Sequence, residues 1–180
     1  MKIGYLMVGV SGSGKSTVVN ELTKLHQNAA VFSLDKCRLE LFKMQSAISM
    51  SDAELYAGAF EYATKYQQQF DSFVTSSWKS ALEQDVVIVD NTNLTRKGRA
   101  RWCNEMHDKG FNVIGVSVSA PLQVVLDRQS TRGDKSVPAK IVREMYMRQQ
   151  ELFVGSEVDE ILHVDGTHAP VIFHSGNFAE

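Results

Sequence analysis

Short apolar runs alternate along the chain with longer stretches in which apolar residues recur every three to four positions. Runs rich in Val and Ile are typical of buried parallel strands, and they occupy residues 3–8, 30–34, 85–90, 112–119 and 160–164. Helical spacing occupies residues 16–26, 52–82, 95–109, 121–131 and 138–153. We expect one long helix or two joined helices over residues 52–82. Strands that alternate with helices predict an α/β fold of three layers, in which helices flank a parallel central sheet.

The composition is that of an ordinary globular protein. Of the 180 residues, 43% are hydrophobic and 22% are charged, which suits a single domain over residues 1–180. Cys37 and Cys103 have neither disulfide-framework nor zinc-ligand spacing. Because no charged-then-apolar leader and no apolar run of membrane length occurs, we expect a soluble cytoplasmic protein without membrane partners. The net charge of −2 gives no general attraction to nucleic acid, so a polynucleotide would need a local basic patch.

Residues 9–16 read G-V-S-G-S-G-K-S, a complete G-x-x-x-x-G-K-[S/T] phosphate loop between an apolar run and a helical stretch. Its glycines allow a tight turn whose backbone N–H groups face a phosphate at the positive end of the following helix. Lys15 can reach the β- and γ-phosphates, and the Ser16 hydroxyl can ligate Mg²⁺. The loop therefore predicts a nucleoside triphosphate site formed by Gly9, Ser11, Gly12, Ser13, Gly14, Lys15, Ser16 and Thr17.

Two carboxylates lie at the ends of predicted strands, Asp35 directly after residues 30–34 and Asp90 as the last residue of 85–90. In open parallel sheets, ligands bind beyond the carboxyl ends of the strands, so both side chains are expected at the cleft of the phosphate loop. Asp35 is a candidate general base, and its alternative role is the N-cap of a helix that begins at Lys36. Arg38 lies one turn later, where it would bind a phosphate of the acceptor or form a surface ion pair.

Asp90 resembles the Walker-B carboxylate of phosphate-loop proteins, which either holds the Mg²⁺ shell through water or orients the acceptor. The alternative is a helix-capping role, or a turn-forming role with Asn91 and Thr92. Residues 128–138 read R-Q-S-T-R-G-D-K-S-V-P, in which Arg128 and Arg132 share a helix face before a glycine-containing loop. The segment predicts a mobile lid with an arginine over the transferred phosphate, and beside a phosphate loop this is favoured over a basic, solvated helix end.

Together these segments resemble the phage 5′-polynucleotide kinases, which form the kinase half of the polynucleotide kinase-phosphatases. The resemblance includes the phosphate loop, Asp35-x-x-Arg38, the Thr-Asn-Leu turn at 92–94, segment 128–138 and the Gly166-Thr167 turn. It implies a single P-loop kinase domain over residues 1–180, with a helical lid at about 128–140 and acceptor-side helices at about 36–82.

The resemblance further implies that the γ-phosphoryl group of ATP is transferred to the 5′-hydroxyl of DNA or RNA, in the host cytoplasm if a phage encodes the protein. Lys15 and Ser16 would hold the β-phosphate and Mg²⁺, Asp35 would be the base, and Arg38 would grip the 3′-phosphate of the acceptor. Arg132 would be the lid arginine. Arg128, Gly166 and Thr167 would complete the nucleotide site, and Asp90 the acceptor site.

The sequence departs from this family on the acceptor side. Lys36 replaces the second acidic residue after the base, and Asn91 is an additional residue between Asp90 and Thr92. Alternative acceptors are therefore a small alcohol, a nucleoside or nucleotide, or a hydroxyl on a modified base. A third hypothesis is an ATP-dependent binding module without an acceptor. The sequence decides neither DNA against RNA nor the donor base, and it leaves homo-oligomerisation open because no stripe marks an interface.

Overall fold

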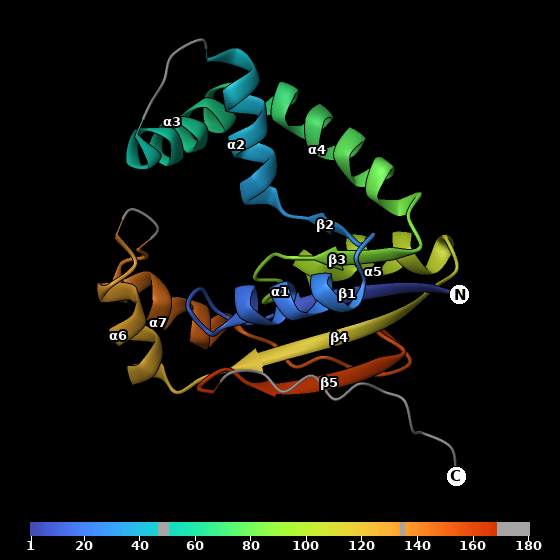
Figure 1. The fold of residues 1–180 in the computed structure, drawn as a ribbon. Helices are drawn as coiled ribbons and strands as arrows, with labels where there is room; N and C mark the ends of the chain where they lie inside the picture. Colours follow the sequence, from blue (N-terminus) through green and yellow to red (C-terminus); the bar gives the residue numbers. More distant parts are fainter. Residues whose placement is uncertain (47–50, 134–135, 169–180) are drawn as a thin grey trace.

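A computed structural model describes residues 1–46, 51–133 and 136–168. Its centre is a five-stranded sheet of order β2-β3-β1-β4-β5 in which every neighbouring pair is parallel (Figure 1). The strands are β1 (Lys2–Val8), β2 (Ala30–Phe32), β3 (Val86–Val89), β4 (Phe111–Ser119) and β5 (Glu160–Asp165). The α/β class and the parallel sheet predicted from the sequence are confirmed.

Helices cover both faces of this sheet, and further helices extend beyond its carboxyl edge (Figure 1). The helices are α1 (Lys15–Leu25), α2 (Leu34–Gln45), α3 (Asp52–Lys65), α4 (Gln67–Leu82), α5 (Arg96–Asp108), α6 (Leu122–Ser130) and α7 (Ala139–Arg148). On one face of the sheet, apolar side chains of α1 pack against those of β1, β3 and β4. Helices α4 and α5 pack on the other face. Helices α2 and α3 form a layer above the sheet, and α6 packs against α7 at its carboxyl end (Figure 1).

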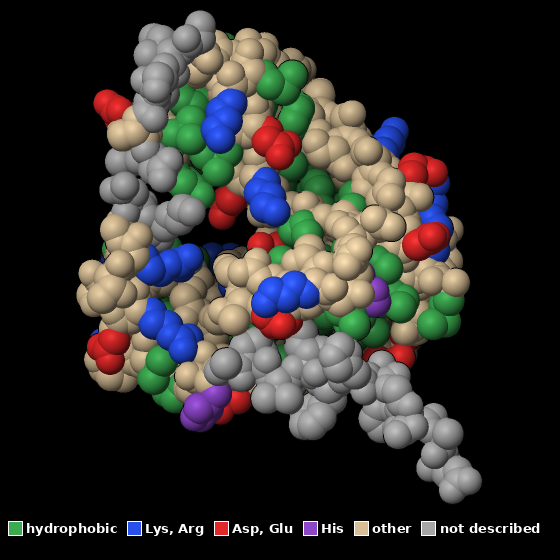
Figure 2. Space-filling model, in the orientation of Figure 1, with side chains coloured by type: hydrophobic (Ala, Val, Ile, Leu, Met, Phe, Trp, Pro, Cys, Tyr) green, Lys and Arg blue, Asp and Glu red, His purple; other side chains and the backbone are tan. Residues whose placement is uncertain are grey.

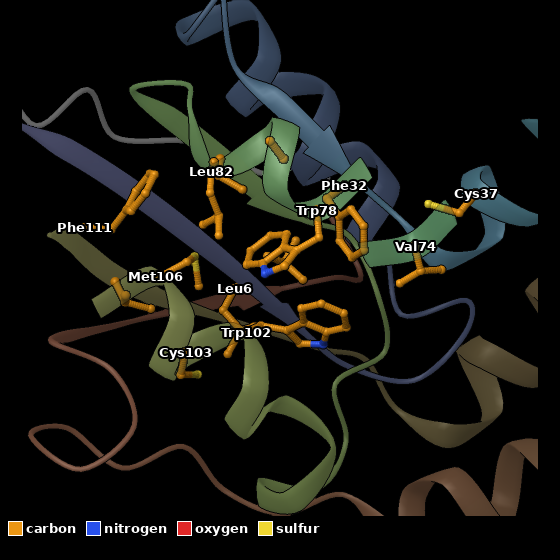
Figure 3. Packing of buried hydrophobic residues seen from close by; sticks show 14 of the residues in the cluster. Leu6, Phe32, Cys37, Val74, Trp78, Leu82, Trp102, Cys103, Met106 and Phe111 are labelled. Carbon is orange, nitrogen blue, oxygen red and sulfur yellow. The ribbon is translucent and has the colours of Figure 1, made fainter. Parts of the chain in front are cut away.

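Three aromatic rings join β2, α4 and α5 in the main core (Figure 3). The ring centroids of Phe32, Trp78 and Trp102 lie 5.0 Å apart in each pair, and all three side chains are buried. Trp78 also donates from Nε1 to Oε2 of Glu105 at 2.9 Å. Tilted ring pairs stabilise a core beyond the area that they bury. Because Phe32 is the last residue of β2, this cluster fixes the place where α2 begins.

Several element boundaries differ from those predicted. Residues 52–82 form two helices joined at Tyr66, which is the second alternative, and a capping box of Ser51 and Glu54 starts α3. The helix predicted over 138–153 ends at Arg148, because Gln149 is extended and the next residue, Gln150, donates its amide to the carbonyl of Leu94.

A buried ion pair anchors the segment that follows β3. Arg99 is fully buried on α5 and binds Glu157 through two hydrogen bonds, Nε to Oε1 at 2.9 Å and Nη2 to Oε2 at 3.0 Å. Its Nη1 donates to the carbonyls of Asn93 and Gln150. A single buried guanidinium therefore ties the turn after β3 to the chain after α7.

None of the helices within the described ranges is long and apolar enough to cross a membrane.

Candidate functional site

The phosphate loop connects β1 to α1 and is held in shape by its glycines. Gly12 and Gly14 have φ values of 89° and 107°, in the left-handed region that side chains disfavour. A Cβ on Gly12 would lie 2.8 Å from Nε2 of Gln129. Within the described part of the chain, no group accepts a hydrogen bond from the amides of Lys15 and Ser16 at the start of α1. These free N–H groups at a helix N-terminus suit an anion.

Lys15 lies at the centre of this loop with 9% of its surface exposed. Its Nζ donates to the carbonyls of Gly9 and Val10, each at 2.8 Å. The pKa of Lys15 is lowered to about 8, mainly by burial and also by Arg132, whereas Asp90 and Asp35 oppose this shift. The ammonium therefore lies within the electrostatic reach of both carboxylates and of the lid arginine.

A cleft of about 790 Å³ runs from the phosphate loop to α2, and Figure 2 shows a hollow between the body of the sheet and the overlying helical layer. The predicted site residues that line this cleft are Ser11, Gly12, Gly14, Lys15, Ser16, Thr17, Asp35, Asp90, Arg128, Arg132, Gly166 and Thr167. Gly9, Ser13 and Arg38 are not among its lining residues. Segments far apart in the sequence thus meet where the sheet topology places a ligand.

Asp35 lies in the first turn of α2, where the positive end of a helix favours a carboxylate. The alternative in which it caps a helix beginning at Lys36 is wrong, because β2 ends at Phe32, Ser33 is the N-cap and α2 begins one residue before Asp35. Asp35 Oδ1 accepts a hydrogen bond of 2.6 Å from Nη1 of Arg38. Of the two roles considered for Arg38, the structure contains the ion pair.

Arg38 is also held on its other side by aromatic rings. Its guanidinium carbon lies 5.7 Å from the ring centroid of Phe60 on α3 and 5.3 Å from that of Phe70 on α4. Both distances fall within the range of cation–π attraction. The arginine is therefore fixed between α2, α3 and α4 and bound to the carboxylate that faces the cleft.

Asp90 follows β3 directly, and its backbone N–H donates to the carbonyl of Phe32 at 2.8 Å. Burial raises the pKa of its carboxyl group and Asp35 adds to the rise, whereas Lys15 and Lys36 oppose it. Asp90 and Ser16 both line the cleft and supply oxygen atoms of the kind that Mg²⁺ prefers. Within the described residues, no group of three or more His, Cys, Asp or Glu side chains could hold a metal.

The two arginines of the predicted lid bind the phosphate loop. Arg128 donates from Nη1 to the carbonyl of Gly12 at 3.1 Å and from Nη2 to that of Gly166 at 2.6 Å. Arg132 donates from Nη1 to Oγ of Ser11 at 2.9 Å. They are thus engaged at the cleft, unlike the arginines of a simple solvated helix end. Residues 134 and 135 of the lid lie outside the described residues.

The Gly166-Thr167 turn closes the cleft beside the phosphate loop. A Cβ on Gly166 would lie 1.8 Å from the carbonyl oxygen of Ser13, so only glycine fits against the loop here. Asp165 Oδ1 accepts hydrogen bonds from the backbone N–H and the hydroxyl of Thr167. These bonds lower the pKa of Asp165 to about 2 and fix the turn.

Sequence reasoning missed the roles of three amide side chains around the site. Gln129 is buried, donates from Nε2 to the carbonyl of Ser11 at 2.8 Å and accepts from the amide of Val137 at 3.0 Å. Asn93 has a φ of 48° and donates to the carbonyl of Met7, and asparagine in a turn after a strand was a usable signal for that backbone. The side chain of Asn91 accepts from the amide of Leu34 at 2.9 Å, a contact without a local sequence signal.

The phosphate loop between β1 and α1 and the parallel strand order define a P-loop protein. Residues 5–154 match the AAA domain family, and the chain belongs to this family. This assignment supports the P-loop kinase superfamily, which is a coarser conclusion than the resemblance to phage polynucleotide kinases.

Solved structures of two kinases and of a toxin-antitoxin system share the fold. A sugar kinase from Janibacter sp. HTCC2649 is 17% identical and aligns with a TM-score of 0.54 over 93% of this chain and 87% of that one. A gluconokinase from Sinorhizobium meliloti 1021 is 15% identical, with a TM-score of 0.53 over 92% and 83%. A structure from the PezAT toxin-antitoxin system of Streptococcus pneumoniae is 14% identical, with a TM-score of 0.60 over 99% and 74%.

Proposed function

We propose that this protein is an ATP-dependent, Mg²⁺-requiring phosphotransferase that phosphorylates a hydroxyl group of a small acceptor. The observation that carries the proposal is the cleft in which Asp35 faces Lys15 and the lid residue Arg132. A phosphate loop alone would fit any nucleotide-binding protein. A carboxylate on the opposite wall supplies the base that a kinase needs and that a simple binding module does not.

The donor half of the cleft would bind the triphosphate of ATP. The free amides of Lys15 and Ser16 and the ammonium of Lys15 would hold the phosphates, with Arg132 compensating negative charge on the transferred group. Ser16 would ligate Mg²⁺, and Asp90 would support it through water. Bound Mg²⁺ would neutralise charge that develops on the phosphate oxygens.

The acceptor half would use Asp35 as the general base. The acceptor oxygen attacks the γ-phosphorus while its proton passes to the Asp35 carboxylate, and the bond from the γ-phosphorus to the β–γ bridging oxygen breaks to release ADP. Arg38 binds one carboxylate oxygen of Asp35, which leaves the second oxygen for the acceptor proton. The pair would thus orient the base as well as keep it close to the cleft.

Two observations favour a small acceptor over a polynucleotide. The acceptor-side stretch 34–82 has no excess of positive charge, since Lys36, Arg38, Lys43, Lys65 and Lys79 are balanced by Asp35, Glu40, Asp52, Glu54, Glu61 and Asp71. A polynucleotide normally requires a basic groove. The fold is also shared with a sugar kinase and a gluconokinase.

A polynucleotide 5′-hydroxyl is the second candidate acceptor, and the position of Arg38 favours it. A guanidinium beside the base would bind the 3′-phosphate of a nucleotide as a planar fork. In this case the Asp35–Arg38 pair would rearrange when the acceptor binds. Arg38 alone would then have to supply the attraction for the polynucleotide that a wider basic surface normally provides.

A panel of acceptors tests the proposal and separates the two candidates. Labelled ATP and Mg²⁺ are offered with sugars, sugar acids, nucleosides, nucleotides and 5′-hydroxyl oligonucleotides of DNA and RNA. Transfer to a sugar or another small alcohol is the expected result. Exclusive transfer to oligonucleotides would replace the small acceptor by the second candidate. ATP hydrolysis without transfer to any of these acceptors would contradict both.

A further inference from the structure

We propose that Asn91 is a positioning residue, which caps α2 from the end of the neighbouring strand and thereby holds Asp35 in the cleft. This inference rests on the proposed function in so far as Asp35 accepts the proton of the acceptor. It concerns a residue that the sequence presents as an addition between Asp90 and Thr92.

The N-terminus of α2 lacks a cap of its own. Ser33 occupies the N-cap position with an extended backbone, and its side chain makes no capping hydrogen bond. The first amides of a helix have no partner within the helix and need an external acceptor. Asn91 supplies one for the first amide, because its Oδ1 accepts from the N–H of Leu34 at 2.9 Å although the two residues are 57 positions apart.

The same bond determines where Asp35 lies. Asp35 directly follows Leu34, so its side-chain direction depends on the start of α2. A second bond, from the N–H of Asp90 to the carbonyl of Phe32 at 2.8 Å, fixes the other end of this short connection. Asp35 and Asp90 are thus connected, because the segment 32–35 is hydrogen-bonded to residues 90 and 91. Small displacements of a reacting group are costly in enzymes, so this tether has a direct consequence for the chemical step.

The amino group of Asn91 makes the proposal testable without unfolding the protein. Its Nδ2 is buried and has no hydrogen-bond partner in the described part of the structure. A leucine at this position has the same branching and number of heavy atoms and removes the unsatisfied amino group, but it leaves the Leu34 amide without an acceptor. Removal of the buried amino group raises the free energy of unfolding, and loss of the acceptor for the Leu34 amide lowers it, so the two effects oppose each other. An aspartate keeps the acceptor oxygen and places its charge at the positive end of α2, where it is favourable.

The experiment compares Asn91→Leu, Asn91→Asp and the control Asn112→Leu. Asn112 lies at the amino end of β4, whereas the cleft lies beyond the carboxyl ends of the strands, and its side chain donates to Glu160. Amide hydrogen exchange over residues 33–41, kcat and the KM for ATP are measured. We expect Asn91→Leu to lose protection at the start of α2 and to lower kcat by about 10- to 100-fold, with the KM for ATP changed by less than about twofold. Asn91→Asp and Asn112→Leu should retain both protection and kcat.

Unchanged protection in Asn91→Leu would overturn the proposal, as would an equal loss of melting temperature and ATP binding in both Asn91 variants. Lost protection with unchanged kcat would also overturn it, since Asp35 would then not need the tether. If the wild-type protein phosphorylates no acceptor in the panel, the proposed function fails separately. In that case amide hydrogen exchange tests only whether Asn91 caps α2. The cap requires that protection is lost in Asn91→Leu and kept in Asn91→Asp.

Discussion

The carboxylate of Asp35 accepts a hydrogen bond of 2.6 Å from the guanidinium of Arg38, one turn later on α2. The Asp35 side chain is 80% exposed and that of Arg38 is 25% exposed, so the pair is solvated on the side of the carboxylate. Exposed ion pairs contribute little to stability. Under the proposed function, the role of this pair is to orient the Asp35 carboxylate at the cleft.

Arg38→Ala should separate the two acceptor classes. With a small acceptor, the loss of orientation at Asp35 lowers kcat by about tenfold or less and leaves the KM of the acceptor unchanged. With an oligonucleotide, the loss appears mainly in the KM and depends on the 3′-phosphate. Lys43→Ala, on the exposed surface of the same helix, is the control and should change neither constant. Steady-state kinetics with both acceptor classes provide the measurement.

The pKa of Lys15, lowered to about 8 by burial, predicts a pH dependence of nucleotide capture. Below pH 8 the ammonium is charged and attracts the phosphates, and above it the free enzyme loses this charge. The value of kcat/KM for ATP should therefore fall as the pH rises through about 8. Lys15→Arg keeps the charge throughout this range, so its residual kcat/KM should not show the fall. A wild-type profile that stays flat up to pH 10 would contradict the assignment of Lys15.

Gln129→Leu should weaken both the fold and nucleotide binding. The change leaves the carbonyl of Ser11 and the amide of Val137 without their partner, at a cost of about 1–3 kcal/mol in the free energy of unfolding. Because Ser11 belongs to the phosphate loop, the affinity for an ATP analogue should fall as well. Gln123→Leu is the control, since Gln123 lies on the exposed face of the same helix and donates to Asp127. Urea unfolding and nucleotide titration measure both effects, and equal results for the two variants would refute the role of Gln129.

Glu157→Gln should be strongly destabilising, because it leaves the fully buried charge of Arg99 without a counter-ion. Removal of one partner from a buried pair typically costs about 3–5 kcal/mol. Glu21→Gln breaks the exposed pair with Lys24 and should cost about 0–1 kcal/mol. Denaturant unfolding measures the loss in the free energy of unfolding for both variants. Equal losses would show that Arg99 is hydrated in solution and would contradict the prediction.

The fold and the outline of the site could be predicted because both depend on local patterns. The β-branched runs identify the strands, and parallel topology brings Asp35 and Asp90 to one edge regardless of the details of packing. The glycines of residues 9–14 identify the phosphate loop, since its backbone tolerates few other residues. Element boundaries depend on contacts outside the local pattern, and the start of α2 at Leu34 shows that a strand and a helix can meet with only one residue between them.

The supporting contacts could not be predicted, because they join segments that are distant in the sequence. Gln129 binds Ser11 across 118 positions and Asn91 binds Leu34 across 57. Their amide side chains are compatible with many surface roles, and only the packed structure assigns their partners. The same holds for Arg99, which the sequence places on a basic helix and the structure buries completely.

The most direct test of the central claim is phosphoryl transfer by the wild-type protein and by Asp35→Asn, with labelled ATP, Mg²⁺ and the acceptor panel. The account predicts that the label appears on an acceptor hydroxyl and that Asp35→Asn lowers this rate by about 10²- to 10⁴-fold while the protein still binds ATP. Release of the label only as inorganic phosphate, at the same rate in both proteins, would contradict it. That result would identify an ATP-dependent binding module instead of a kinase.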